Sequence, residues 1–262
     1  MLPASSSMSM HINHQYVLDF CEQRRKSVPQ GSFAALDYGC GKGETVIAGR
    51  ERGLEIYGAE AFYEGSNIYP EIEASGLFGT IIRRVKDGRL DFPENYFDVV
   101  VSNQVFEHVS DLDAVLNEIK RVLKPGGVTL DLFPSRDVWR EGHCGIPFVH
   151  WFPKTSRLRR PYMLILRRLG MGKFKANRPP EKFVDTLLPW LDQFTLYRKR
   201  PEIFRSFRQF FSVELVEDNY ICYRLEATGR GMLSPLVRFP LFKPIAEEMF
   251  RKLGGLVVLA KK

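Results

Sequence analysis

Apolar and polar positions follow two spacings in the first half of the chain, and these predict strands that alternate with helices. Short apolar runs rich in β-branched residues indicate buried strands, and they occupy residues 33–39, 54–60, 80–85, 97–103 and 128–134. Apolar residues at helical spacing predict helices over residues 12–26, 44–53, 63–75 and 111–124. This alternation is typical of βαβ units, and therefore of a parallel sheet covered on both faces.

The alternation breaks after Pro134. Residues 135–205 are rich in arginine, proline and aromatic residues and show no clean period. Regular patterns return in residues 206–262, with a predicted helix over 240–254 and a final strand over 254–262. We therefore expect one α/β domain in four parts: an N-terminal tail and helix (1–30), a core (31–134), an inserted cap (135–205) and C-terminal strands that complete the sheet (206–262).

Three glycines, Gly39, Gly41 and Gly43, follow the first predicted strand directly. Ligands of open parallel sheets bind beyond the carboxyl ends of the strands, and glycines let them approach the backbone. The dinucleotide pattern needs a glycine where this chain has Glu44, and no Lys-Ser or Lys-Thr follows, so neither that pattern nor a P-loop matches. The segment is therefore either a ligand site of another kind or only a tight turn.

Two carboxylates accompany this turn. Asp37 lies at the end of the first strand, where it would repel a pyrophosphate but could accept hydrogen bonds from a cationic amino group. Glu60 ends the second strand, where a carboxylate that binds ribose hydroxyls is expected. The pair therefore favours a ligand with a cationic group over a phosphate.

Several spaced motifs together resemble the class I S-adenosylmethionine (SAM) dependent methyltransferases. The motifs are "LDYGCGKG", Glu60 at the end of the second strand, "KDGRLDFPENYFDVVVSNQVFEHV" and "EIKRVLKPGGVTLDLFP". They are most similar to the type 11 methyltransferase domain, in order over about residues 33–134, and beyond residue 134 only the final strand fits. The resemblance implies SAM as cofactor and a doubly wound, mostly parallel seven-stranded sheet of the Rossmann-like class I methyltransferase fold. In that fold the last strand is antiparallel and inserts between strands five and six.

The resemblance also implies a set of cofactor-binding residues. The glycine turn with Asp37 would hold the methionine part of SAM, and Glu60 would take the two ribose hydroxyls. Asp87 would accept a hydrogen bond from the adenine amine, although in isolation it is interpreted as a turn residue. Asn103 would flank the methyl sulfonium. The full set is Asp37, Tyr38, Gly39, Cys40, Gly41, Gly43, Glu60, Ala61, Asp87, Gly88, Arg89, Asn103 and Gln104.

Three histidines are candidates for a general base, which a hydroxyl acceptor usually requires. His108 follows the fourth strand near the mouth of the cofactor site, unless it only caps or packs the following helix. His143 and His150 lie after the fifth strand in "EGHCGIPFVHWFP", where enzymes of this family commonly build the acceptor pocket. A metal site formed by His143, Cys144 and His150 matches no standard ligand spacing, so no metal is predicted.

The net charge of +7 comes from one part of the chain. Residues 142–180 contain nine Lys and Arg and no Asp or Glu, so the remainder sums to −2. A positive field of this kind attracts an anionic partner. Residues 154–178 are therefore interpreted in three ways: as a solvated surface helix, as a lid that binds an acidic acceptor, or as a peripheral contact with an anionic membrane.

These observations predict a SAM-dependent methyltransferase that methylates an oxygen of a small or lipid- or nucleotide-linked acidic acceptor. The alternatives are an RNA or protein methyltransferase, or a non-catalytic SAM-binding module that acts through its basic surface. Nucleic acid is disfavoured, because "SNQVF" stands where a base-modifying enzyme of this fold would more often have an Asn/Asp-Pro-Pro-aromatic signature. Four scattered cysteines and the lack of a secretory signal predict a cytoplasmic protein, with the membrane surface as a second location.

Overall fold

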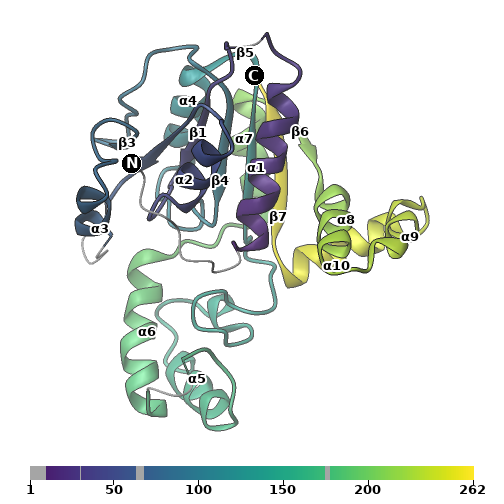
Figure 1. The fold of residues 1–262 in the computed structure, drawn as a ribbon. Helices are drawn as coiled ribbons and strands as arrows, with labels where there is room; N and C mark the ends of the chain where they lie inside the picture. Colours follow the sequence, from purple (N-terminus) through teal and green to yellow (C-terminus); the bar gives the residue numbers. More distant parts are fainter. Residues whose placement is uncertain (1–9, 30, 63–67, 175–177) are drawn as a thin grey trace.

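Seven strands form one sheet in the order β3-β2-β1-β4-β5-β7-β6 in a computed structural model, which describes residues 10–29, 31–62, 68–174 and 178–262 (Figure 1). Strands β1 to β5 pair in parallel, and β7 runs antiparallel between β5 and β6. This confirms the predicted class I methyltransferase fold, including the inserted last strand. The strands are β1 (Ala35–Tyr38), β2 (Ile56–Glu60), β3 (Ile82–Arg84), β4 (Phe97–Asn103), β5 (Leu123–Phe133), β6 (Ser212–Leu215) and β7 (Leu256–Lys261).

Helices cover both faces of the sheet (Figure 1). Successive residues of each strand point to opposite faces. Val99 and Val101 therefore enter the apolar core under α1 (Ile12–Arg25) and α2 (Glu44–Glu51), whereas Val100 enters the core under α4 (Leu112–Val122) and α7 (Arg200–Phe210). The helices of the described residues are α1 (Ile12–Arg25), α2 (Glu44–Glu51), α3 (Tyr69–Ala74), α4 (Leu112–Val122), α5 (Arg159–Arg168), α6 (Pro180–Phe194), α7 (Arg200–Phe210), α8 (Glu217–Ala227), α9 (Ser234–Arg238) and α10 (Lys243–Leu253).

Most predicted elements differ from the structure by one to three residues at their ends, and among the strands the start of β5 differs most. The strand expected over residues 128–134 begins five residues earlier, at Leu123, so "KPGG" lies within β5 rather than in a loop. Parallel pairing of Leu123 with Phe97 holds this segment to β4, and the register shifts before Val99 pairs with Val128. The helix expected over residues 63–75 is described only as α3, because residues 63–67 lie outside the described residues.

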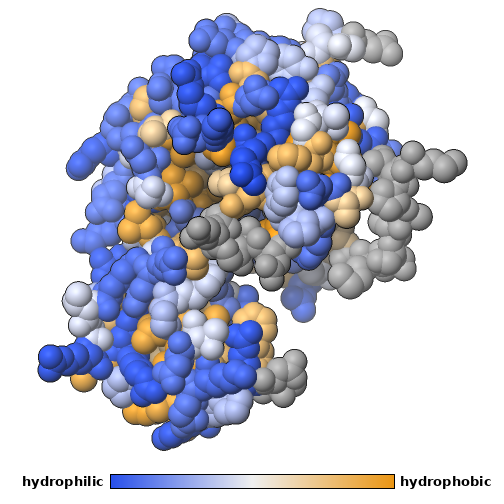
Figure 2. Space-filling view, turned by 90° about the vertical axis from the view of Figure 1, so that its left-hand side faces the viewer, coloured by the Kyte–Doolittle hydropathy of each residue, from blue (hydrophilic) through white to orange (hydrophobic). Residues whose placement is uncertain are grey.

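The segment between β5 and α7 forms a cap at the carboxyl edge of the sheet. It contains α5, α6 and a short 3-10 helix (Val149–Trp151), and it has its own apolar cluster, which includes Met163, Phe183 and Leu191. Figure 2 shows this cap as a lobe of its own, mostly hydrophilic with apolar patches between the charged side chains. The cap therefore adds a second wall opposite the strand ends.

The four cysteines are buried free thiols, as their scattered positions predict. No helix among the described residues is both long enough and apolar enough to cross a bilayer.

Candidate functional site

The glycine turn connects β1 to α2 at the carboxyl edge of the sheet. The backbone is left-handed at Gly39, Gly41 and Gly43, with φ of +73°, +53° and +80°, a conformation that costs other residues about 1–2 kcal/mol. The amides of Gly39 and Cys40 donate to the carbonyl of Ala59 at 2.7 and 3.2 Å. These bonds fold the turn over the end of β2.

One side of this turn is crowded and the other is open. A Cβ at Gly39 would collide with the side chain of Val105, whereas a Cβ at Gly41 would meet nothing within 4 Å. A first cleft of about 340 Å³ and a second cleft of about 460 Å³ flank the turn, and both are lined by Gly39, Gly41, Ile68 and Gln104. The first cleft has the volume of a small-molecule site.

Segments that follow four strands, together with the cap, form the walls of the first cleft. One wall is the glycine turn with Tyr38, and the opposite wall comes from the cap, more than 80 residues later in the chain. The lining residues beyond the turn are Glu60 and Ala61 at the end of β2, Ile68, Val85 after β3, Gln104, Val105, His108 and Val109 after β4, and Gln193 and Phe194 at the end of α6.

Glu60 presents an oriented carboxylate to the first cleft. Its Oε2 accepts from the Gly41 N–H at 2.9 Å, and its Oε1 accepts from the N–H groups of Ala61 at 2.9 Å and Phe62 at 3.3 Å. A carboxylate has about four lone-pair sites. The bonds to the backbone therefore fix its direction and leave acceptor capacity for the hydroxyl groups of a ligand.

Asp37 lies beneath the glycine turn and lines neither cleft; it is only 5% exposed. Burial raises the pKa of Asp37 to about 7, although a hydrogen bond from Thr45 partly opposes this by stabilising the carboxylate. The Thr45 hydroxyl also contacts Nδ1 of His14 at 2.6 Å. Because His14 lines the second cleft, a chain of hydrogen bonds leads from the buried carboxylate to that cleft.

The end of β4 forms part of the second cleft, which Asn103 and Gln104 both line. The Asn103 side chain accepts a hydrogen bond from Asn13 of α1 at 2.9 Å, and Gln104 is left-handed, with φ of +58°. Helix α1 thus completes this cleft with His11, Asn13 and His14.

Asp87, Gly88 and Arg89 line neither of the two clefts. Asp87 and Gly88 have φ of +51° and +73°, and Lys86 and Arg89 exchange backbone hydrogen bonds across them at 3.0 and 2.9 Å. This is a two-residue hairpin turn, in which Asp-Gly is favoured because both central residues need positive φ. Asp87 and Gly88 thus have the conformation of turn residues, and their contact with an adenine stays a prediction.

The structure brings His108 and His143 together and places His150 elsewhere. The rings of His108 and His143 lie 5.0 Å apart, and His108 lines the first cleft. Burial lowers the pKa of His108, although a 2.6 Å contact between its Nδ1 and the Phe194 carbonyl opposes this. His150 instead packs on Tyr197 with ring centroids 4.7 Å apart, beside a separate cavity of about 180 Å³ in the cap.

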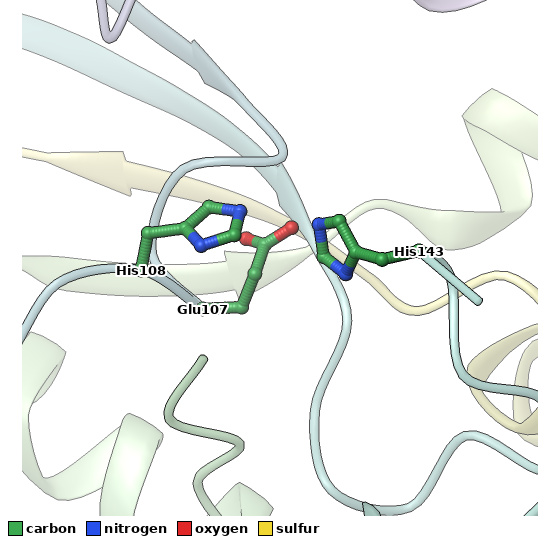
Figure 3. A group of neighbouring side chains, drawn as sticks. All are labelled: Glu107, His108 and His143. Atoms are coloured by element: carbon green, nitrogen blue, oxygen red, sulfur yellow. The ribbon is translucent and has the colours of Figure 1, made fainter. Parts of the chain in front are cut away.

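Glu107 lies between the two paired histidines (Figure 3). It is 1% exposed, and neither of its carboxylate oxygens has a hydrogen-bond partner among the described residues. Burial raises its pKa to about 8. The liganding atoms of Glu107, His108 and His143 lie within 4.8 Å of one another. The described residues show no such grouping of His143 with Cys144 and His150, the combination that the sequence analysis set aside.

Glu141 supports this group from behind. Its Oε1 accepts from Nδ1 of His143 at 2.7 Å and from the Tyr197 hydroxyl, and its Oε2 accepts from the Cys144 N–H. Burial alone would raise the pKa of Glu141, but these hydrogen bonds hold it well below its usual range. Glu141 is therefore a buried anion whose hydrogen-bonding capacity is used within the protein.

Sequence reasoning missed several residues of the site. Glu107 and Glu141 stand beside the predicted histidines in "FEHV" and "EGH", and this adjacency is a signal that could have found them. His14, Gln193 and Tyr197 have no local signal, because helices or cap segments distant in the sequence bring them to the site.

The cap is less cationic in three dimensions than its sequence suggests. Acidic residues of α6, just beyond the basic segment, form ion pairs with three of its arginines: Arg159–Asp192, Arg160–Asp185 and Arg168–Glu181. Arg167 is buried, and its guanidinium donates to backbone carbonyls. Lys175 lies outside the described residues.

Comparisons with known proteins place this site in a family. Residues 36–130 match a family model described as a methyltransferase domain. The chain is 38% identical over 106 residues to the sterol 24-C-methyltransferase of Yarrowia lipolytica, with 38% of this chain and 27% of that protein covered. It is 36% identical over 118 residues to the demethylmenaquinone methyltransferase of Geobacillus stearothermophilus, with 43% and 50% covered.

A third relative matches over a longer stretch of the chain. The chain is 27% identical over 149 residues to the ubiquinone biosynthesis O-methyltransferase of Mesorhizobium japonicum, with 56% of this chain and 60% of that protein covered. The matched stretches thus span between about a quarter and three fifths of these curated relatives. By these matches, residues 36–130 belong to the methyltransferase domain family, whose members depend on SAM.

Proposed function

We propose that this protein transfers a methyl group from SAM to an acceptor held between the sheet and the cap. One observation carries the proposal: within the methyltransferase domain, the Glu60 carboxylate and the open side of Gly41 face one cleft, which His108 and the cap close. The groups that would hold the cofactor, Glu60 and Gly41, therefore lie in the same cleft as a side chain that can exchange a proton, His108.

Residues of the two clefts suit the ribose, adenine and methionine parts of SAM in turn. Glu60 would hold the ribose hydroxyls, and Ala61 and Val85 would form an apolar floor beside the adenine. The methionine part would lie in the second cleft near Asn103, where His14 leads to the buried charge of Asp37. SAM supplies a methyl group already activated on a cationic sulfur, so the protein contributes orientation and a dry, polarised site.

The acceptor would enter next to His108. The Nδ1 of His108 is engaged by the Phe194 carbonyl, so its Nε2 is free to accept the proton of a hydroxyl group. This favours transfer to oxygen. The relatives are named for both a C- and an O-methyltransferase, so their names leave the acceptor atom open.

A cationic cavity in the cap supports an acidic acceptor. The cavity of about 180 Å³ is lined by Arg136 and Lys154, by Arg159, which already pairs with Asp192, and by His150 and Tyr197. Tyr197 also donates to Glu141 behind the histidine pair, so the segment 193–197 separates this cavity from the first cleft. An acidic group bound here would anchor the acceptor beside the site of transfer.

Exposed apolar side chains favour membrane contact through residues 154–178. Leu158, Ile165 and Leu169 are 69%, 57% and 70% exposed and lie among arginines, an arrangement typical of surface-bound amphipathic segments. Replacement of these three residues by serine should abolish sedimentation with anionic phospholipid vesicles. The matched control replaces Leu236 of α9, Phe239 directly after it and Ile245 of α10, which are also exposed. If only the control loses binding, the contact lies there instead.

Radiolabelled SAM tests the function directly. We expect the protein to transfer label from methyl-labelled SAM into the acidic lipid or small-molecule fraction of a cell extract. The Glu60→Ala variant should lose this transfer, and the Leu236→Ser variant should keep it. Label that enters only RNA or protein would contradict the proposed acceptor class. Calorimetric binding of SAM without any label transfer would identify a non-catalytic binding module.

A further inference from the structure

We propose that Glu107, His108 and His143 form a binding site for one divalent transition-metal ion at the junction of sheet and cap. The three side chains point toward one another from the loop after β4 and from the cap (Figure 3). Their liganding atoms lie within 4.8 Å of one another. The sequence-based prediction of no metal rested on ligand spacing, which does not register ligands brought together from distant segments.

The spacing is close to that of a metal-bound triad. Tetrahedral ligation at about 2.0–2.2 Å places ligand atoms roughly 3.3–3.6 Å apart. The three side chains therefore need to close by no more than about 1.5 Å around an ion. Rotation of the side chains is sufficient for a change of this size.

Both histidines have the tautomer that a metal ligand needs. Nδ1 of His108 lies 2.6 Å from the Phe194 carbonyl, and Nδ1 of His143 lies 2.7 Å from the Glu141 carboxylate. Both partners are acceptors, so each Nδ1 carries a proton, and in the neutral ring each Nε2 then presents a lone pair. Ligating histidines are generally oriented in this way by a carbonyl or carboxylate behind the ring.

Glu107 supplies the independent evidence for a ligand. A buried carboxylate normally accepts hydrogen bonds. Glu107 is 1% exposed, yet no other described residue donates to either of its oxygens, and only its own backbone N–H is near. A cation between Glu107 and the two Nε2 atoms would satisfy all three groups at once. Two imidazoles and one carboxylate suit zinc, iron or cobalt better than magnesium or calcium, which prefer oxygen ligands.

The fourth position of such a site would open toward the first cleft, because His108 lines that cleft. Catalytic zinc sites with three protein ligands keep an open position of this kind. If the proposed methyl transfer holds, an oxygen of the acceptor would be the fourth ligand. The metal would then take over from His108 the activation of that oxygen.

Cobalt titration of the full, untagged chain tests the site without any need for activity. The protein, dialysed against chelator, should bind one equivalent of Co²⁺ with a Kd of about 10 µM or tighter. Visible absorption bands of a four- or five-coordinate ion should appear without a thiolate charge-transfer band, and Zn²⁺ should displace them. Absence of a stoichiometric complex at 100 µM metal (about ten times that Kd), or a thiolate band, would overturn the proposal.

Variants assign the ligands. Glu107→Gln, His108→Gln and His143→Gln should each weaken Co²⁺ binding at least tenfold, and Glu141→Gln should weaken it roughly 10–100-fold through the orientation of His143. His150→Gln is the matched control in the same loop and should bind as the wild type does. Equal loss in this control, or unchanged affinity in the three ligand variants, would refute the assignment. Asp37→Asn should lose SAM binding and keep Co²⁺, which separates this test from that of the proposed function.

Discussion

Replacement of Asp37 by asparagine should stabilise the protein while it removes the cofactor. Asp37 is buried beneath the glycine turn, and the described residues provide no cation to pair with it. Burial raises its pKa from 3.8 to about 7. Above pH 7 the protein therefore keeps an ionised carboxylate where burial favours the neutral form, and asparagine removes this cost.

The magnitude follows from linkage between protonation and folding. Because the folded-state pKa lies above the unfolded value, the folded state binds the proton more tightly, and stability falls as pH rises from about 4 to about 7. A shift of about 3 pH units at 1.36 kcal/mol per unit amounts to ~4 kcal/mol. The cost is absent below pH 4 and complete above pH 7.

Urea unfolding at several pH values measures this effect. The free energy of unfolding of Asp37→Asn minus that of the wild type should grow by roughly 3 kcal/mol between pH 5 and pH 8. Asp131→Asn is the matched control, because Asp131 is equally buried with a pKa also raised to about 7, yet it lines neither cleft. Both variants should gain stability with pH, and only Asp37→Asn should lose SAM affinity. A difference that is flat with pH would refute the reasoning.

Three further predictions concern the cofactor site. By calorimetry, SAM affinity should fall about tenfold per pH unit below pH 7, because binding requires the ionised form of Asp37. An affinity that does not change between pH 5.5 and pH 7.5 would contradict this. Gly39→Ala should lower the free energy of unfolding in urea by ~2–4 kcal/mol, because of backbone strain and the collision with Val105. Gly41→Ala should lower it by only about 1 kcal/mol and yet weaken SAM binding. Equal losses of stability in the two variants would contradict the difference between the crowded and the open side of the turn. Glu60→Gln should weaken SAM binding at least tenfold and leave the unfolding free energy within about 1 kcal/mol, and unchanged affinity would exclude it from the site.

The sheet could be predicted because its signals are local. Strand β4 reads "FDVVVSN" in a chain whose parallel strands are buried on both faces, and its predicted bounds match the structure. The start of β5 could not be predicted in the same way. There the turn chemistry of Pro125, Gly126 and Gly127 indicates a loop, but pairing with β4 keeps the segment in the strand.

The site was predictable on its sheet side and not on its cap side. The glycine turn and Glu60 follow from their positions at strand ends, and the structure places both at the first cleft. The contact between His108 and Phe194 joins residues that are 86 positions apart in the sequence. The local spacing of apolar residues does not predict contacts between segments so far apart. The same limit applies to charge, since the partners of the basic segment lie in α6, outside the run that a local count includes.

A crystal of the complex with S-adenosylhomocysteine would show directly whether the first cleft holds the cofactor. We predict that its ribose hydroxyls lie within hydrogen-bond distance of the Glu60 carboxylate, with the nucleoside across the open side of Gly41. A complex in which the nucleoside lies outside the first cleft, with Glu60 still bonded only to the backbone, would contradict the account.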